Sequence, residues 1–255
     1  MRSALLITML LLSPSLILAQ RPTAKATPKP RTSTVKPKAT PTATPEPTPT
    51  PDPAAVEAEL FDKAHSATEL KDRISLLEKF IAEFPASERI AEVRESLLIA
   101  RPARADEMLD SGDIDGGLAL LRKTIEDSPD TTPDRFFSEV IMKIPGNLYF
   151  RGLRDQALEH AALIEKRVGN NAARLAELAN FYIAVENGSE AARIATKATE
   201  IDPASSAAFQ TLGMTYRLNF ELEKSLAAFE KAYQLDSNSA SALRGLADLE
   251  RTLGF

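Results

Sequence analysis

The residues that could perform chemistry in this sequence are few and lie far apart. The chain contains no cysteine, and its two histidines are His65 and His160. Disulfides and thiolate metal sites are therefore excluded by composition. Each histidine stands alone on a charged, helix-like stretch, and Glu69, which follows His65 by one helical turn, is a single acid without further ligands at helical spacing. We interpret both histidines as solvated helix residues and predict no metal site.

The stretch DSGDIDGG, residues 110–117, is similar to the start of a calcium-binding loop. When Gly116 is aligned with the obligatory turn position of such a loop, Arg122 falls where a bidentate glutamate is required. An arginine there repels the ion, so we predict a tight turn between two helices instead. In that turn Gly112 would adopt a positive φ angle, and Asp113 would cap the next helix.

No nucleophilic catalytic set can be assembled from this sequence. The serines lie in expected caps and turns, and neither histidine stands near a nucleophile motif. The carboxylates of EVRESLL and LADLERTL have arginines nearby on the same exposed helix faces. The NGS triplet at 187–189 fits the N-glycosylation pattern, but Asn-Gly is also favoured in the inter-helix turn expected there. We predict a protein that is not an enzyme and that needs no cofactor.

The N-terminal segment 1–19 has the layout of a secretory signal peptide. Arg2 precedes an apolar run from Ala4 to Leu12, and a Ser-Pro-Ser break follows. We predict cleavage after Ala19, a secreted or periplasmic location, and no transmembrane segment after cleavage. The run is shorter than the roughly 20 apolar residues of a spanning helix, although retention of 1–19 as an anchor stays open.

The segment 20–53 is a linker rich in proline and threonine. It contains ten prolines and nine threonines, so it cannot build a packed core and is expected to be disordered and extended. Six basic and two acidic residues give it a charge of +4, which leaves weak contact with a cell wall or membrane surface open. Without Arg2 and this linker the net charge of −5 becomes −10 (−5 − 1 − 4) for residues 54–255. An acidic body argues against nucleic acid as the main partner.

The C-terminal part of the chain repeats with a fixed period of 34 positions. The corresponding pairs are Leu175 and Phe209, Leu178 and Leu212, Ala179 and Gly213, Tyr182 and Tyr216, Ala191 and Ser225, Ala195 and Phe229, Ala198 and Ala232, and Asp202 and Asp236. A fixed period of this length, with two helical segments in each unit, is typical of a solenoid of helix hairpins. Small residues at Ala179 and Gly213 would let the paired helices approach closely, and larger residues would fill the groove between them.

The motifs FQTLGMTY at 209–216, SLAAFEKA at 225–232 and AARIATKATEIDP at 191–203 resemble the tetratricopeptide repeat family. This resemblance implies an all-α fold: a right-handed superhelical solenoid of antiparallel helix hairpins in residues 54–255, after a disordered N-terminal region. The clearest repeats are 172–205 and 206–239, and 240–255 would form a capping helix. The stretch EKFIAEFPASERIAEVRESLL at 78–98 looks like repeat units of exported envelope-assembly proteins.

The repeat pattern extends upstream with less regular spacing. We expect a first hairpin in 54–85 and a second in 105–129, joined by a long helix from about Ser87 to Leu109 that is kinked at Pro102. A further second helix is expected in 152–170. Its first helix is expected to be poor, because Pro145-Gly146 would break it.

The family resemblance also implies where a partner would bind. In that family the first helix of each repeat lines a concave groove. Carried over by alignment, the groove residues are Glu177, Asn180, Ile183, Gln210, Thr211, Met214, Arg217, Arg244, Asp248 and Arg251.

The family's best-known binding mode clamps a C-terminal carboxylate, and only Asn180 matches that residue set. The other four places are occupied by Ala176, Thr211, Ser241 and Gly245. We expect the three arginines of the groove to attract an acidic peptide or helix instead, with adaptable apolar contact from Met214 and Ile183.

The expected function is therefore that of an exported, non-enzymatic scaffold or adaptor that binds a peptide or helix of a partner protein. One alternative is a structural component of the cell envelope whose basic linker contacts the cell wall. Another is an accessory subunit of an envelope enzyme or assembly complex. A hydrolase would need a buried polar cluster that the sequence does not indicate.

Overall fold

The computed structural model of the chain describes residues 52–254. The predicted signal peptide, and all but the last two positions of the predicted linker, lie outside this range. The helices are α1 (Pro53–Ser66), α2 (Leu70–Glu83), α3 (Ile90–Asp110), α4 (Ile114–Glu126), α5 (Asp134–Phe136), the π-helix η1 (Phe137–Ile141), α6 (Lys143–Phe150), α7 (Arg154–Val168), α8 (Ala172–Ala184), α9 (Gly188–Ile201), α10 (Ser206–Leu218), α11 (Leu222–Leu235) and α12 (Ala240–Leu253). No strand occurs in the described range, and no helix in it is both long and apolar enough to cross a membrane.

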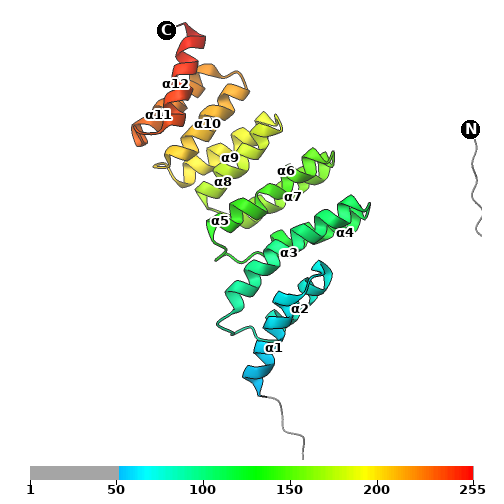
Figure 1. Ribbon diagram of the computed structural model, residues 1–255. Coiled ribbons are helices and arrows are strands. Elements are labelled where there is room, and N and C mark those ends of the chain that lie inside the picture. The colour runs from blue at the N-terminus through cyan, green and yellow to red at the C-terminus, as the bar shows by residue number, and fades with distance from the viewer. Residues whose placement is uncertain (1–51, 255) are drawn as a thin grey trace, which may run out of the picture. The chain divides into compact units, whose positions relative to one another are not determined.

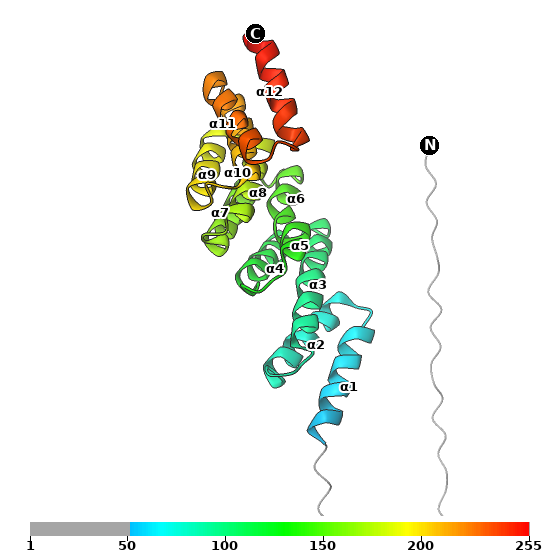
Figure 2. The same cartoon turned by 90° about the vertical axis from the view of Figure 1, so that its left-hand side faces the viewer.

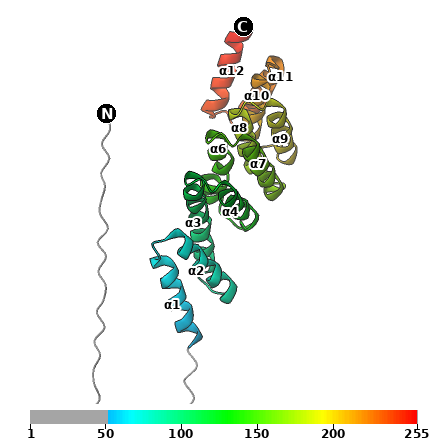
Figure 3. The same ribbon diagram turned by 90° about the vertical axis from the view of Figure 1, so that its right-hand side faces the viewer.

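The helices pack as successive antiparallel hairpins, which confirms the prediction of an all-α helix-hairpin solenoid (Figure 1). The pairs are α1 with α2, α3 with α4, α6 with α7, α8 with α9 and α10 with α11, and α12 follows alone. Figures 2 and 3 show α3, α6, α8 and α12 along one side of the stack and α4, α7, α9 and α11 along the other. We call the side formed by α3, α6, α8, α10 and α12 the first-helix face.

The repeat period of the sequence is visible in the helix caps. Asn171, Ser205 and Ser239 precede α8, α10 and α12, and each lies one full period after the one before. Each side-chain oxygen accepts a hydrogen bond from a backbone N–H in the first turn of its helix, at 3.1, 3.2 and 3.2 Å. These bonds satisfy N–H groups that have no partner inside the helix, so the same local chemistry starts three successive first helices.

Two apolar clusters hold the hairpins together. The smaller cluster joins α1, α2 and the first half of α3 around the fully buried Leu77 and Phe80. The larger cluster runs from α3 and α4 through the following hairpins to α10 and α11. At the C-terminal end the ring of Phe229 lies between Gly213 and Gly245, and a Cβ atom on these glycines would come within 2.8 and 2.5 Å of the ring. Glycine is thus required at both positions for the close approach of α10 and α12 to α11.

Each of four turns inside the hairpins contains one residue with a positive φ angle. This residue is Gly112 (φ 90°), Gly152 (φ 84°), Glu186 (φ 58°) and Phe220 (φ 60°) in four successive hairpins. The Gly112 turn agrees with the sequence analysis, including the cap formed by Asp113, whose carboxylate accepts from the Gly116 N–H at 3.1 Å.

The predicted break at Pro145-Gly146 is wrong. Both residues lie within α6, where Pro145 occupies the third position. A proline in the first turn of a helix costs little, because N–H groups there have no partner within the helix. The irregularity lies upstream instead, at η1, where the Met142 N–H donates to the carbonyl of Phe137 at 3.0 Å and one extra residue is accommodated. The long helix α3 forms as expected, but it begins at Ile90 and continues through Pro102.

Candidate partner-binding surface

The ten residues predicted to line a groove all lie on the first helices α8, α10 and α12. Four are exposed (Asn180, Arg217, Arg244, Arg251), five are half-buried (Glu177, Ile183, Gln210, Met214, Asp248) and one is buried (Thr211). The structure therefore places nine of the ten where a side chain can be reached from solvent.

The clearest group among them is a cluster of charges at the contact between α10 and α12. The Arg251 guanidinium donates to the Asp248 carboxylate at 3.2 Å, and Arg217 lies 3.9 Å from the other oxygen of Asp248. Arg244 is exposed on the same helix and forms no ion pair within residues 52–254. Three arginines accompany one aspartate, so this end of the first-helix face carries an excess of positive charge.

Two of the predicted residues serve the solenoid itself. The Gln210 amide donates to Ser239 at 2.8 Å and to Ser206 at 3.1 Å, which ties α10 to the start of α12. Glu177 accepts a hydrogen bond from Ser138 in η1 at 2.6 Å, which ties α8 to the π-helix. Both remain half-buried, but their polar groups already have partners.

The prediction that Thr211 faces a partner is wrong. Thr211 is only 3% exposed and so offers almost no surface to a partner. Successive residues on an α-helix are rotated by about 100°, so the neighbour of an outward residue readily lies on a buried side. Ala176 and Gly245, which occupy places of the carboxylate clamp, are buried as well.

A shallow cavity lies further along the first-helix face, between α3 and the segment formed by η1 and α6. Its volume is about 170 Å³, and its lining includes Ile99, Val140, Lys143 and Asn147. Ile99 is 52% exposed. Sequence reasoning missed this cavity because its shape depends on the π-helix, for which the sequence carries no recognisable pattern.

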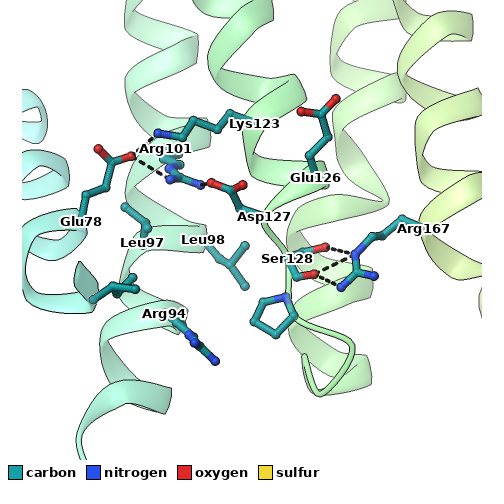
Figure 4. A pocket seen from close by; sticks show the side chains of 12 residues that line it. Glu78, Arg94, Leu97, Leu98, Arg101, Lys123, Glu126, Asp127, Ser128 and Arg167 are labelled. Carbon is teal, nitrogen blue, oxygen red and sulfur yellow. Dashed lines mark hydrogen bonds and ion pairs between the residues drawn. The ribbon is translucent and has the colours of Figure 1, made fainter. Parts of the chain in front are cut away.

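A further cavity lies between the first hairpin, the second hairpin and α7 (Figure 4). Its volume is about 520 Å³, and we call it the inter-hairpin pocket. Its apolar wall includes Ile81 of α2, Leu97 and Leu98 of α3, and Pro129 after α4. Charged side chains surround this wall.

A buried arginine organises these charges. Arg101 is 3% exposed, and its guanidinium donates to Glu78 at 2.7 Å and contacts Asp127 at 2.9 Å. Lys123 donates to the same Glu78 oxygen at 2.8 Å. The Nε–H of Arg101 has no hydrogen-bond partner in the described part of the chain. These ion pairs join α2, α3 and α4, and thus connect the first two hairpins.

The cations around Glu78 determine its ionisation. Burial by itself raises the pKa of the Glu78 carboxyl, but the hydrogen bonds from Lys123 and Arg101 outweigh burial, so the pKa lies below its ordinary value of 4.5. Glu78 is therefore expected to be ionised at neutral pH. Arg167 of α7 closes another side of the pocket by donating to the backbone carbonyl of Ser128 at 2.7 Å.

The interpretation of His160 as a solvated residue is wrong. The side chain is 1% exposed, and its ring nitrogens lie 2.7 Å from the carbonyl oxygen of Gln156 and 3.3 Å from that of Leu118. The sequence did contain the signal, since His160 falls on the apolar stripe of Ala157, Ala161 and Ile164.

The other histidine, His65, is partly buried, with ring nitrogens near Phe61 and Ser96. The Glu92 carboxylate lies 3.9 Å from His65 Nε2. Between residues 52 and 254 no three His, Cys, Asp or Glu side chains gather as metal ligands would.

No family model matches the chain, and no curated protein matches it. Solved structures of other proteins match parts of it. The first TPR of Spaghetti (RPAP3), bound to the HSP90 peptide SRMEEVD, has a TM-score of 0.40 and 16% identity over 46% of this chain and 94% of its own. The Sgt2 TPR domain from Aspergillus fumigatus has a TM-score of 0.41 and 23% identity, over 50% of this chain and 85% of its own. A tetratricopeptide repeat protein from Parabacteroides merdae has a TM-score of 0.45 and 15% identity, over 78% of this chain and 74% of its own.

Proposed function

We propose that this chain is an exported, non-enzymatic scaffold that binds a peptide or helix of a partner protein on its first-helix face. The fold supports this proposal, because a stack of helix hairpins presents an extended surface to which each repeat contributes side chains. The accessible residues of that face combine charge with adaptable apolar contact. Half-buried Ile183 and Met214 supply the apolar part.

The observation that carries the proposal is the charge cluster of α10 and α12. Arg217, Arg244 and Arg251 are all exposed, and within residues 52–254 Asp248 is the one acidic residue that pairs with any of them. Exposed charges of one sign attract an oppositely charged partner and orient it during encounter. An acidic peptide or an acidic face of a helix is the partner that this cluster fits.

A pull-down from an envelope extract of the host tests the proposal. The bait is Ala54–Phe255, which keeps the helical hairpins and omits the basic linker. We expect wild type to recover partner proteins, and a variant with Arg217→Glu, Arg244→Glu and Arg251→Glu to lose them. High salt during binding should weaken recovery by wild type, since exposed charges are screened.

A matched control separates the site from overall charge. Lys71→Glu, Lys166→Glu and Lys231→Glu together change the net charge by the same amount at exposed lysines that form no ion pair within the described residues and lie outside the first-helix face. This control should recover partners as wild type does. Equal recovery by the arginine variant and wild type would refute binding on the first-helix face.

Export is proposed from the sequence of residues 1–19, which lie outside the described range. Mass spectrometry of the protein from its host should find an N-terminus at Gln20 and locate the protein outside the cytoplasm. A protein that keeps Met1 and stays in the cytoplasm would contradict this part of the proposal.

The cell-wall alternative is favoured by one observation, the excess of six basic over two acidic residues in 20–53. Sedimentation of a peptide covering 20–53 with isolated wall tests it separately. If that peptide stays in solution while the pull-down succeeds, the linker acts only as a spacer.

A further inference from the structure

The inter-hairpin pocket lies away from the charge cluster proposed to bind a partner. Its lining comes from α2, α3, the end of α4 and α7, whereas the charge cluster lies on α10 and α12. A volume of about 520 Å³ falls within the usual range for binding pockets, which is about 300–1,000 Å³. The pocket is thus large enough to hold a ligand of its own.

Most charges of the pocket are already neutralised within the protein. Glu78 and Asp127 pair with Arg101, and Lys123 pairs with Glu78. Arg167 pairs with Asp130 and with the carbonyl of Ser128. A ligand would gain little from these groups, because it would first have to displace partners that hold them in place.

Two charged side chains of the pocket form no ion pair within residues 52–254. They are Arg94 on α3 and Glu126 at the end of α4, and both are exposed. Figure 4 shows Arg94 and Glu126 on different sides of Leu98. The pocket therefore offers one available cation, an apolar patch and one available anion, in that order across its width.

From this arrangement we propose that the inter-hairpin pocket binds a short segment of a partner protein in which aliphatic residues separate an acidic from a basic side chain. The carboxylate of the segment would pair with Arg94, its aliphatic side chains would cover Leu97 and Leu98, and its basic group would pair with Glu126. Buried Arg101 keeps the wall in place by fixing α2 and α4 to α3.

The chain's own linker is disfavoured as the occupant on grounds of charge. The pocket is lined by four cations and three anions, a net charge of +1, and the linker 20–53 carries six basic and two acidic residues. A segment with one charge of each sign meets both unpaired groups without adding repulsion.

Titration of the full chain with four short peptides tests the proposal. The probes are the acetylated, amidated tetrapeptides Asp-Leu-Leu-Lys and Lys-Leu-Leu-Asp, which offer the charges in both directions, with Asp-Gly-Gly-Lys and Lys-Leu-Leu-Lys as comparisons. We expect saturable binding of at least one of the first two by about 1 mM, and weaker binding of both comparisons.

Charge reversal at the pocket gives the specific readout. Arg94→Glu should weaken the preferred probe by at least about tenfold and make Lys-Leu-Leu-Lys the better ligand. Arg244→Glu, in the charge cluster of α10 and α12, should leave probe binding unchanged, so the pocket and the charge cluster can be tested separately. Failure of both mixed-charge probes to saturate, or equal affinity of wild type and Arg94→Glu with folding intact by circular dichroism, would overturn the proposal.

Discussion

Glu78 binds two cations at once, so its charge contributes more to stability than that of an isolated surface glutamate. Replacing it with glutamine leaves the buried guanidinium of Arg101 with Asp127 as its one carboxylate partner among residues 52–254. We expect Glu78→Gln to lower the free energy of unfolding by about 1–2 kcal/mol. Solvent screening limits the effect, because the Glu78 side chain is 36% exposed. Urea denaturation at pH 7 measures it, and Glu83→Gln on the same helix is the control.

The same variant also tests how the contribution of Glu78 to stability depends on pH. The folded-state pKa of Glu78 lies below its ordinary value of 4.5, so its ionised form stabilises the fold. This stabilisation is fully present above pH 4.5 and is lost as the pH falls through the lower, folded-state pKa. The difference in unfolding free energy between wild type and Glu78→Gln should therefore shrink below pH 4.5. A difference that stays constant down to about pH 3 would contradict the assigned ion pairs.

Two glycines in helices should respond to alanine in opposite directions. At Gly245 a Cβ atom would lie 2.5 Å from the ring of Phe229, so Gly245→Ala should destabilise the protein by about 1–3 kcal/mol. At Gly146, also helical, nothing lies within 4 Å of a new Cβ. Gly146→Ala should stabilise by about 0.5–1 kcal/mol, because alanine favours the helix. Thermal denaturation of both variants checks the signs, and a Gly245→Ala variant as stable as wild type or more stable would show that packing around Phe229 is not tight.

Side-chain placement could be predicted from sequence only where a periodic stripe was strong. Leu175, Leu178 and Ala195 are buried as their spacing indicates. The predictions for Thr211 and His160 were wrong, since both side chains are buried. Thr211 had been carried over by alignment with the repeat family, and His160 had been assigned to solvent because it lies on a charged stretch. The difference depends on the rotation of each helix about its axis, which packing sets and the sequence pattern specifies only approximately.

At the scale of elements, the serine caps of α10 and α12 allow a quantitative comparison. Ser205 forms one bond in its capping role, to the N–H of Ala208. Ser239 caps α12 through Ala242 and also accepts from Gln210. Ser205→Ala should cost about 1 kcal/mol, the usual loss of a cap. Ser239→Ala should cost about 0.5–1.5 kcal/mol more, since it also removes the bond between helices.

A double-mutant cycle with Gln210→Ala checks this comparison. Gln210→Ala and Ser239→Ala should be non-additive, whereas Gln210→Ala and Ser205→Ala should be additive. Equal costs for the two serine variants, with additivity in both pairs, would mean that the bond from Gln210 to Ser239 contributes nothing to stability.

The helices themselves were largely predictable because caps, turns and apolar spacing agree in the C-terminal repeats. The region from Asp134 to Phe150 was not, since α5, η1 and α6 form one nearly continuous helical run whose irregularity lies at η1. Pro145 lies in the first turn of α6, where a proline costs little, and even Pro102 inside α3 does not end its helix. A π-helix is set by the packing of the extra residue and has no simple sequence sign.

At the scale of the molecule, each hairpin depends on its neighbours, so removing one end should loosen the chain locally. Deleting residues 240–255 removes Gly245 and so uncovers one side of the Phe229 ring on α11. We expect hydrogen-exchange protection in α10 and α11 to fall by at least about tenfold, while α1 to α4 keep theirs. Exchange measured by mass spectrometry on both proteins tests this. A uniform loss along the whole chain would indicate one cooperative unit instead.

The solenoid could be predicted from the fixed repeat period, whereas the cavities could not. A repeat in sequence specifies contacts that recur between neighbouring units, and α8 to α12 show those contacts. The inter-hairpin pocket and the cavity beside η1 arise where the spacing departs from that period, between the first hairpins. Their lining combines residues such as Glu78 and Arg167 that are far apart in sequence and belong to no shared motif.

The contact of Phe229 with Gly245 has a consequence for how such a chain could grow or be rearranged. One period earlier the equivalent positions hold Ala195 and Thr211. There the smaller side chain lies on the second helix and the larger one on the following first helix, the reverse of Phe229 and Gly245. If a second copy of 206–239 were inserted after Ser239, the copy of Thr211 would take the place of Gly245 against the ring of Phe229. The repeats are therefore not interchangeable, because the side-chain volumes on the two sides of each junction must match. The order of the repeats along the chain is fixed by this matching.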